Sequence, residues 1–288
     1  MKILLTGGNG YIGSKLALGL QGHEIEIFDK PKDIRNEQEL KEAIKGKDIV
    51  YHLAALAELS YTDAHPQETY EVNIVGANNV AKVCAEEKVL LNFVSTCCIY
   101  GNPLEKVSRE GRMINPSDTY AMSKAAGEYI VKMWGLAKGL KYNILRFGTV
   151  YGQSTDKNMR SDMAIQKFVN AAGNHLPITI TGDGNQARNF IHIDDLVSAL
   201  VLVTEKGVIG ETINLGGKER TSIIEIAKLL GLTDITFVPA RKDDFIKQNV
   251  SLMKAKKLLG WSPKVKFEEG LKSMYAFYNN TSENGNIS

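Results

Sequence analysis

Residues 3–13 read Ile3-Leu4-Leu5-Thr6-Gly7-Gly8-Asn9-Gly10-Tyr11-Ile12-Gly13, and they decide the fold of this chain. The apolar start predicts a buried strand, and residues 14–20 that follow are helix-like. Gly8, Gly10 and Gly13 match the pattern G-x-G-x-x-G between a strand and a helix, which is the context the pattern requires. Such glycines let the backbone approach a pyrophosphate closely, and the helix N-terminus presents N–H groups to it. An ordinary glycine-rich turn is the alternative, but the flanking strand and helix favour a dinucleotide site.

A second predicted strand, residues 24–28, ends at Asp29, nineteen residues after Gly10. A carboxylate near this position meets the adenosine ribose diol and repels a 2′-phosphate, which favours NAD over NADP. Lys30 and Lys32 follow directly, and a basic pair could tolerate that phosphate. A surface turn accounts for the two lysines equally well, so the preference for NAD rests on Asp29.

Strand-like and helix-like patterns alternate through the first half of the chain, which is typical of an α/β protein with a doubly wound parallel sheet, the Rossmann fold. After Gly152 the sequence becomes loop-rich and polar, which indicates a smaller C-terminal substrate-binding lobe. Residues 190–203 and 212–215 are expected to return to the sheet. The expected division is a Rossmann domain of residues 1–152 with 189–217, a substrate lobe of residues 153–188 with 218–278, and a polar tail of residues 279–288.

Tyr120-Ala121-Met122-Ser123-Lys124 begins a predicted helix that continues to about residue 138. The spacing i, i+4 puts the phenol and the ammonium on one face, one turn apart. The reference pKa of a phenol is about 10, and a neighbouring cation favours the ionised form, which can exchange a proton with a sugar hydroxyl. A solvated helix face is the alternative, so the catalytic interpretation of this motif needs support from other motifs. Thr96 supports it, because this residue ends an apolar strand at the edge where open α/β sheets bind ligands.

The composition, 43% hydrophobic and 24% charged with a formal net charge of +2, is typical of a globular protein. The charge gives no reason to expect nucleic acid or a membrane surface as a partner. Cys84, Cys97 and Cys98 have no metal-type spacing, and His52 has no second ligand nearby in the sequence, so no metal is expected. A reducing cytoplasm is the simplest setting for such a chain.

Together these stretches resemble the extended short-chain dehydrogenase/reductase family, in its NAD-dependent nucleotide-sugar epimerase/dehydratase branch. The resemblance covers nearly the whole chain. Its motifs are residues 6–13 (TGGNGYIG), 52–55 (HLAA), 73–76 (NIVG), 95–96 (ST) with 99–101 (IYG), Tyr120 with Lys124, Arg146 with 150–152 (VYG), 182–195 (GDGNQARNFIHIDD) and 258–263 (LLGWSP).

The resemblance implies three groups of site residues. Thr96, Tyr120 and Lys124 would be catalytic, and Arg188, Arg241 and Asp244 would hold the nucleotide and diphosphate of a sugar nucleotide. Each of the last three, taken alone, fits a solvated surface charge equally well. The residues implied for NAD are Gly7, Gly10, Tyr11, Ile12, Gly13, Asp29, Asp33, Leu53, Ala54, Ala55, Asn73, Tyr120 and Lys124. The family also implies a homodimer, formed by the helix before Glu87 and the helix that bears Tyr120, with Ile130 and Trp134 buried between subunits or against the sheet.

Three departures from the family pattern bear on the activity, the phosphate contacts and the sheet. Family dehydratases carry Asp-Glu after the catalytic hydroxyl, and Cys97 and Cys98 stand there, which argues against a 4,6-dehydratase. Thr149 replaces the usual asparagine before the VYG motif, which affects the expected phosphate contacts. The segment between Asp29 and Asp48 is short, which puts the usual third strand in question.

The favoured activity is therefore NAD-dependent epimerisation of a nucleotide sugar at C4 through a transient 4-keto sugar. One alternative is a nucleotide keto-sugar reductase, and another is a 3,5-epimerase that uses Cys98 as an acid/base. In relatives with 3,5-epimerase activity, a histidine or lysine serves the opposite face of the sugar, and Met163 stands at that position here. A noncatalytic NAD-binding regulatory protein is an alternative of another class. A pure binder, however, would not require Thr96, Tyr120 and Lys124 together.

Overall fold

The computed structural model describes residues 1–102, 106–153, 163–240 and 249–283. At its centre lies a six-stranded sheet in the order β10-β5-β4-β3-β1-β2, and every pairing in it is parallel. The strands are β1 (Lys2–Thr6), β2 (Glu24–Phe28), β3 (Ile49–His52), β4 (Leu90–Thr96), β5 (Tyr142–Phe147) and β10 (Thr212–Leu215). The predicted α/β class with a Rossmann sheet is confirmed.

The edge of this sheet beyond β1 differs from the full Rossmann arrangement. Doubly wound dinucleotide folds have two further strands on this side of the first one. Here β2 is the edge strand, and the chain passes from Asp29 directly to α2 (Glu37–Ile44). The short segment after Asp29 therefore contains no third strand, which answers the question that its length raised.

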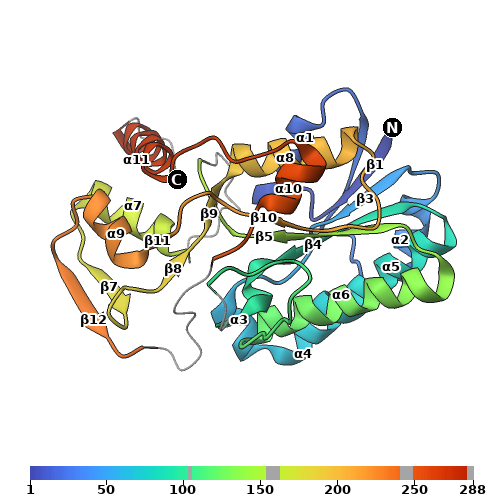
Figure 1. The fold of residues 1–288 in the computed structure, drawn as a ribbon, viewed down its shortest axis with the longest axis horizontal. Helices are drawn as coiled ribbons and strands as arrows, with labels where there is room; N and C mark the ends of the chain where they lie inside the picture. Colours follow the sequence, from blue (N-terminus) through green and yellow to red (C-terminus); the bar gives the residue numbers. More distant parts are fainter. Residues whose placement is uncertain (103–105, 154–162, 241–248, 284–288) are drawn as a thin grey trace.

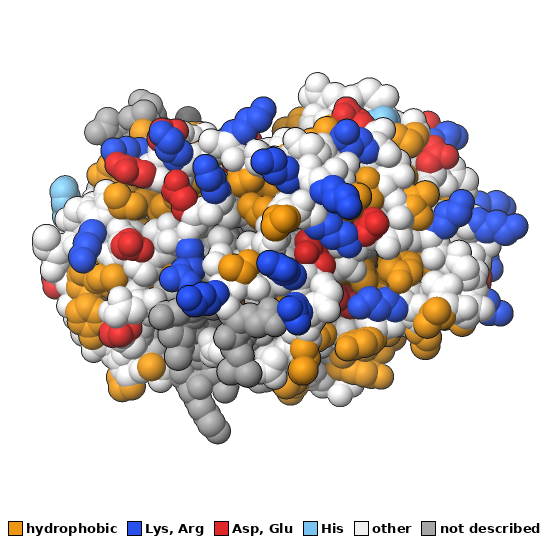
Figure 2. Space-filling view, in the orientation of Figure 1, with side chains coloured by type: hydrophobic (Ala, Val, Ile, Leu, Met, Phe, Trp, Pro, Cys, Tyr) orange, Lys and Arg blue, Asp and Glu red, His pale blue; other side chains and the backbone are white. Residues whose placement is uncertain are grey.

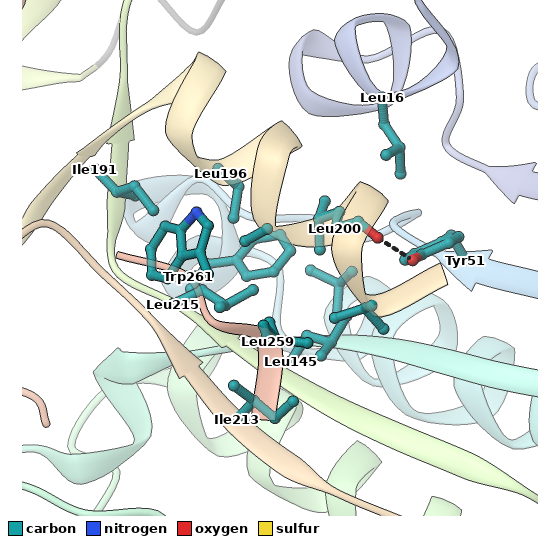
Figure 3. Close-up of a cluster of buried hydrophobic side chains, with 14 of the residues drawn as sticks. Leu16, Tyr51, Leu145, Ile191, Leu196, Leu200, Ile213, Leu215, Leu259 and Trp261 are labelled. Carbon is teal, nitrogen blue, oxygen red and sulfur yellow. Dashed lines mark hydrogen bonds between the residues drawn. The ribbon is translucent and has the colours of Figure 1, made fainter. Parts of the chain in front are cut away.

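Helices cover both faces of the sheet (Figure 1). On one face lie α1 (Tyr11–Gly19), α8 (Ile193–Glu205) and α10 (Met253–Leu259), and on the other lie α2, α5 (Ala77–Glu86) and α6 (Thr119–Lys138). The first face forms a buried cluster in which Tyr51 donates a hydrogen bond to the carbonyl of Leu200 at 2.8 Å (Figure 3). Trp261 packs into the same cluster, and its indole donates to Ser198 at 2.9 Å. Residues 253–261 thus pack on the Rossmann sheet, which differs from the expected assignment of residues 218–278 to the second lobe.

The second lobe lies beside one end of the sheet (Figure 1). β7 (Ile178–Thr181) pairs with β12 (Ile235–Val238), and β8 (Ala187–Arg188) pairs with β11 (Thr221–Ser222). Around a core that contains Phe168, Ile226 and Leu271 pack α7 (Ala164–Asn174), α9 (Ile223–Leu229) and α11 (Phe267–Glu283). α11 continues past Asn279 to Glu283, so residues 279–283 of the expected polar tail are helical. Residues 284–288 lie outside the described part.

Between the two lobes, β6 (Thr149–Tyr151) pairs with β9 (Phe190–His192) in a separate two-stranded parallel sheet. Of residues 190–203, which were expected to return to the sheet, β9 therefore does not join the main sheet, whereas α8 packs on it. β10 joins the main sheet beside β5, as expected. No helix of the described part is long and apolar enough to span a bilayer.

Ile130 and Trp134, expected at a subunit interface, pack partly buried against this chain's own core on α6. The indole of Trp134 donates to the side chain of Asn78 on α5 at 3.0 Å. This is the intramolecular packing that the sequence left open as the alternative.

Candidate active site

The glycine-rich turn between β1 and α1 forms a tight backbone cradle. Gly7 has a φ of 71°, and a Cβ at this position would lie 2.7 Å from the backbone nitrogen of Ala54. A Cβ on Gly13 would lie 2.5 Å from the carbonyl oxygen of Gly7, so neither position tolerates a side chain. Helix α1 starts at Tyr11 with Gly10 as its N-cap and no acidic residue in its first turn. Its N-terminal N–H groups are therefore suited to a diphosphate, and the cradle fits a dinucleotide.

Asp29 and Asp33, the two carboxylates expected to bind NAD, follow strand β2. The carboxylate of Asp29 accepts the backbone N–H of Asn9 at 2.9 Å and that of Lys30 at 2.8 Å. This places it beside the glycine turn. Asp33 instead receives two-pronged hydrogen bonds from Arg35, with the shortest contact at 2.6 Å. That guanidinium lowers the pKa of Asp33, mainly through the hydrogen bond. A ligand that uses Asp33 would have to share it with Arg35.

The side chain of Asn73 binds the backbone of the loop that follows β3. It lies in η1 (Tyr70–Gly76), a π-helical stretch between α4 (Pro66–Thr69) and α5. Its amide accepts the N–H of Leu56 and donates to the carbonyl of Leu56, both at 2.8 Å, and it donates to Ser123 at 2.9 Å. Asn73 is buried and its side chain is occupied by these bonds. It therefore holds the loop after β3 against α6 instead of facing the cleft.

A cleft of about 670 Å³ brings most of the predicted site residues together. From the cofactor set it is lined by Gly7, Gly10, Tyr11, Ile12, Gly13, Leu53 and Ala55; from the catalytic set by Thr96, Cys98, Tyr120 and Lys124; and from the substrate set by Arg188. Asp29, Asp33, Ala54 and Asn73 lie outside this lining as the structure describes it. Arg241 and Asp244 fall outside the described residues.

Thr96 ends β4 and begins η2 (Cys97–Tyr100). Its hydroxyl oxygen accepts the backbone N–H of Cys98 at 3.1 Å, which leaves its proton for donation to a ligand oxygen. Cys97 points away into the protein, where its thiol donates to the carbonyl of Arg146 at 3.3 Å. Burial raises the pKa of Cys97 well above its usual value. Of these two cysteines, Cys98 is therefore the one that can meet a ligand.

The side chain of Lys124 is charged and buried. Its side chain is 3% exposed, and its ammonium lies 4.4 Å from the ring centre of Phe93. Burial lowers the pKa of Lys124 to about 8, and the carboxylate of Glu128 opposes that shift. The ammonium form is therefore retained at neutral pH but lost in mildly alkaline solution. Tyr120 lies one turn earlier, in the first turn of α6, which Asp118 caps by accepting the N–H of Ala121 at 2.7 Å.

His52 is a buried core residue. Its Nδ1 lies 2.7 Å from the hydroxyl of Thr6, and its ring packs 5.8 Å from that of Phe93. Burial, together with the charge of Lys124, lowers the pKa of His52 to about 3. It is therefore neutral across the physiological range and carries no charge toward the cleft.

Sequence reasoning missed several residues of the cleft wall. The second lobe contributes Lys167, Thr179, Thr181 and Gln186, and α3 (Leu59–Ala64) with the residue before it contributes Glu58 and Ser60. These residues are far apart in the chain. Gln186 falls within the motif of residues 182–195, which was the available signal for it, and the other five fall within none of the quoted motifs. Among the described residues, no group of three or more His, Cys, Asp or Glu side chains is placed to hold a metal ion.

Comparison with known proteins places this architecture in a family. Residues 3–216 match the model of the NAD dependent epimerase/dehydratase family. The chain belongs to this family. As a member of an NAD-dependent family it uses NAD, and the cradle around Gly7 and Gly13 is the part of the chain that fits this cofactor.

The relatives share one class of chemistry. A Bacillus subtilis protein named "Uncharacterized UDP-glucose epimerase YtcB" is 30% identical over 315 residues, covering 96% of this chain and 98% of the relative. The structure of UDP-glucose 4-epimerase from Thermotoga maritima with UDP-glucose matches with a TM-score of 0.90 and 27% identity, covering 98% of this chain and 100% of that one. UDP-glucuronic acid 4-epimerase from Bacillus cereus, in complex with UDP-glucuronic acid and NAD, matches with a TM-score of 0.89 and 28% identity over the same shares of each chain.

Other matches are named as UDP-glucuronic acid decarboxylases and as a dTDP-D-glucose 4,6-dehydratase. The activities differ, but all modify a nucleotide sugar. This chain is accordingly an NAD-dependent enzyme that modifies nucleotide sugars.

Proposed function

We propose that this enzyme epimerises a nucleotide sugar at C4 through a transient 4-keto intermediate. The observation that carries the proposal is that Thr96, Tyr120 and Lys124 line the same cleft as the glycine cradle. A sugar in that cleft can meet a proton acceptor and a hydroxyl donor on the side where the cofactor binds. NAD bound in the cradle would supply the acceptor and donor of the C4 hydride.

The protein's part in this reaction is to move one proton and to hold the sugar oxygen. Tyr120, kept in its ionised form by the ammonium of Lys124, takes the proton of the C4 hydroxyl and later returns it. Thr96 donates its hydroxyl proton to the same oxygen, since its own oxygen is already engaged by the N–H of Cys98. Lys124 would also hold the nicotinamide ribose of bound NAD. Rotation of the keto sugar between the two half-reactions inverts C4.

The side chains that the second lobe contributes to the cleft suit a diphosphate. Arg188 on β8 and Lys167 on α7 both line the cleft, and a guanidinium offers a fixed fork of donors to phosphate oxygens. We assign Arg188, together with Arg241 and Asp244, to the nucleotide and diphosphate. Thr149 lines the same cleft and stands where the family usually has an asparagine.

The dehydratase activity found among relatives is disfavoured by the chemistry of residues 97 and 98. A 4,6-elimination needs one group to protonate the leaving hydroxyl and another to remove the C5 proton. The thiol of Cys97 is fully buried and bonded to a backbone carbonyl, so it cannot serve as either. Cys98 alone cannot perform both tasks.

A second candidate, 3,5-epimerisation, is favoured by one observation: Cys98 lines the cleft. That chemistry normally uses a second acid or base on the opposite face of the sugar. Met163, which lines the same cleft at the N-cap of α7, cannot transfer a proton. C4 epimerisation therefore remains the better assignment, and Cys98 is treated as part of the wall. A keto-sugar reductase would differ by consuming reduced cofactor.

The test is a screen of nucleotide sugars with the products identified by NMR. UDP-glucose, UDP-galactose, UDP-glucuronic acid and their dTDP counterparts would each be incubated with the NAD-loaded enzyme. We expect at least one C4 epimer pair to interconvert to the same equilibrium from either side. Release of carbon dioxide from UDP-glucuronic acid, or a 4-keto-6-deoxy product, would assign a different activity to the site.

A further inference from the structure

A buried ion pair joins α6, the helix that carries Tyr120 and Lys124, to strand β5. The proposed proton transfer does not use this pair. Glu128 on α6 and Arg146 on β5 are 1% and 3% exposed in their side chains. The guanidinium donates from Nε to Oε1 at 2.8 Å and from Nη2 to Oε2 at 2.7 Å. A two-pronged pair of this kind fixes both the distance and the orientation of the elements that carry it.

The pair also holds the segment that carries Thr96. Ser95, the residue before it, donates its hydroxyl to Oε1 of Glu128 at 2.7 Å. At the far end of the segment, the phenol oxygen of Tyr100 accepts from Nη1 of Arg146 at 2.7 Å. Cys97 donates to the carbonyl of Arg146 between these two points. The segment 95–100 is thus attached at three positions to two residues.

Glu128 lies on the same face of α6 as the proposed catalytic residues of that helix. Tyr120, Lys124 and Glu128 follow one another at intervals of four, so they lie on one face of the helix. Along this face a phenol, an ammonium, a carboxylate and a guanidinium succeed one another. Each charge therefore has an opposite charge, or a group that becomes one, as its neighbour.

We propose that the Glu128–Arg146 pair is a positioning unit for the reaction: it sets the separation between Thr96 and the Tyr120–Lys124 face, and it keeps Lys124 charged. The inference rests on the proton-transfer role proposed for Tyr120 and Lys124. Neither Glu128 nor Arg146 lines the cleft in the described part of the chain, so both act through other residues.

The charges around Lys124 support the second half of this proposal. Tyr120 and Glu128 lie one turn before and one turn after it on α6, and from β3 its charge acts on His52, which is neutral at working pH. From β4 it meets the ring of Phe93. Glu128 is the carboxylate that raises the pKa of Lys124 against the effect of burial. Since Arg146 neutralises part of that carboxylate, the pair sets how strongly Lys124 holds its proton.

The test compares pH profiles of kcat/KM with UDP-glucose in the NAD-loaded enzyme. In the wild type we expect turnover to fall as pH rises through about 8, where Lys124 loses its proton. Glu128→Gln keeps the size of the side chain and removes its charge, so this alkaline limb should move to lower pH by about one unit. Adding Arg146→Met to Glu128→Gln removes the remaining charge of the pair, and the limb should move back toward its wild-type position. Lys132→Ala, which removes an exposed ammonium 3.9 Å from Glu128, is the matched control and should leave the limb in place.

Arg146→Lys tests whether the geometry of the ion pair matters apart from the positive charge of residue 146. It keeps the positive charge and loses the fork, so the limb should stay while turnover on the plateau falls by about tenfold or more. The dissociation constant of NAD, measured over the same pH range, gives a readout independent of turnover, because Lys124 is also assigned to the nicotinamide ribose. Thermal unfolding establishes that each variant is folded. Where Glu128→Gln is not folded, Arg146→Lys and the double variant decide.

The outcomes divide cleanly. A wild-type profile with no alkaline limb, in turnover or in NAD binding, would overturn the role of Lys124 and this inference with it. A wild-type limb that a folded Glu128→Gln leaves in place, or an Arg146→Lys variant with full plateau turnover, would overturn this inference and leave the proposed function standing.

Discussion

The backbone N–H of Asn9 donates to the carboxylate of Asp29 at 2.9 Å, which joins the glycine turn after β1 to the end of β2. The carboxylate is thereby fixed beside the cofactor cradle. A 2′-phosphate on the adenosine ribose would meet this negative charge at close range, whereas a ribose diol can donate hydrogen bonds to it.

We therefore expect NAD to bind much more tightly than NADP, by about tenfold or more. Asp29→Ala should reduce that preference, while Glu24→Ala, which removes an exposed carboxylate from the same strand, should not. Calorimetric titration with both cofactors measures each ratio. Equal affinities in the wild type would show that Lys30 and Lys32 have overcome the effect of Asp29.

Tyr120→Phe should abolish most turnover and leave cofactor binding nearly intact. The change removes one hydroxyl that relays a proton, an effect on the order of 100-fold or more, and keeps the shape of the cleft. Tyr129→Phe removes a hydroxyl from the exposed side of the same helix and serves as the control. Near-normal kcat in Tyr120→Phe would exclude the proposed proton transfer.

His52 predicts how stability depends on pH. Its pKa is about 3 in the folded chain and about 6.5 in an unfolded one, so between these values only the unfolded state binds the proton. The free energy of unfolding should therefore fall as pH decreases below about 6.5, by at most about 1.4 kcal/mol per pH unit from this residue. His52→Asn should flatten the dependence between pH 6 and 4 in urea titrations. His175→Asn, at an exposed position with a φ of 53° that asparagine tolerates, should not. An equally steep dependence in both variants would contradict this assignment.

The exposed side of α6 favours the predicted homodimer. Met122, Tyr129, Met133 and Leu136 are each at least half exposed and, at these spacings, form one apolar stripe along the helix. Hydrophobic side chains are visible along the corresponding edge of the molecule in Figure 2. We expect a dimer in sedimentation at micromolar concentration, and a monomer when Met133 and Leu136 are both changed to glutamate. Leu18→Glu, at another exposed apolar position, is the control. A wild-type protein that sediments as a monomer would contradict the predicted homodimer.

The parts of this site that the sequence predicted are those encoded by short-range patterns. The cradle needs glycine where a Cβ would collide with the backbone, as at Gly7 and Gly13, and this requirement leaves a local signature. Tyr120 and Lys124 are joined by helical periodicity. Their presence in one cleft with Thr96 followed from the parallel sheet, whose strand ends meet at one edge.

What the sequence did not reveal depends on contacts between distant residues. Arg146 belongs to a family motif, but its pairing with Glu128 arises from the packing of α6 against β5. The family resemblance assigns Asn73 to the cofactor, and the bonds of its amide to Leu56 and Ser123 follow from tertiary packing. Trp261 lies late in the chain and packs on the first sheet because the chain returns there after the second lobe. No local pattern distinguishes these outcomes.

The role of Cys98 separates the two epimerase assignments. If its thiol is part of the cleft wall, Cys98→Ser should keep substantial turnover, and reaction in deuterated water should leave C3 and C5 of the sugar unlabelled. Mass spectrometry and NMR of the product measure both. Deuterium at C3 or C5 that disappears in Cys98→Ser would assign the 3,5-epimerase activity and give Cys98 the proton.

The fate of the C4 hydrogen tests the central claim most directly. UDP-glucose carrying deuterium at C4 would be turned over many times in ordinary water by enzyme holding a single equivalent of NAD, and the product examined by NMR. We expect UDP-galactose that retains the deuterium at C4, with no net change in the oxidation state of the cofactor. Loss of the label to water, or consumption of reduced cofactor in proportion to product, would contradict it.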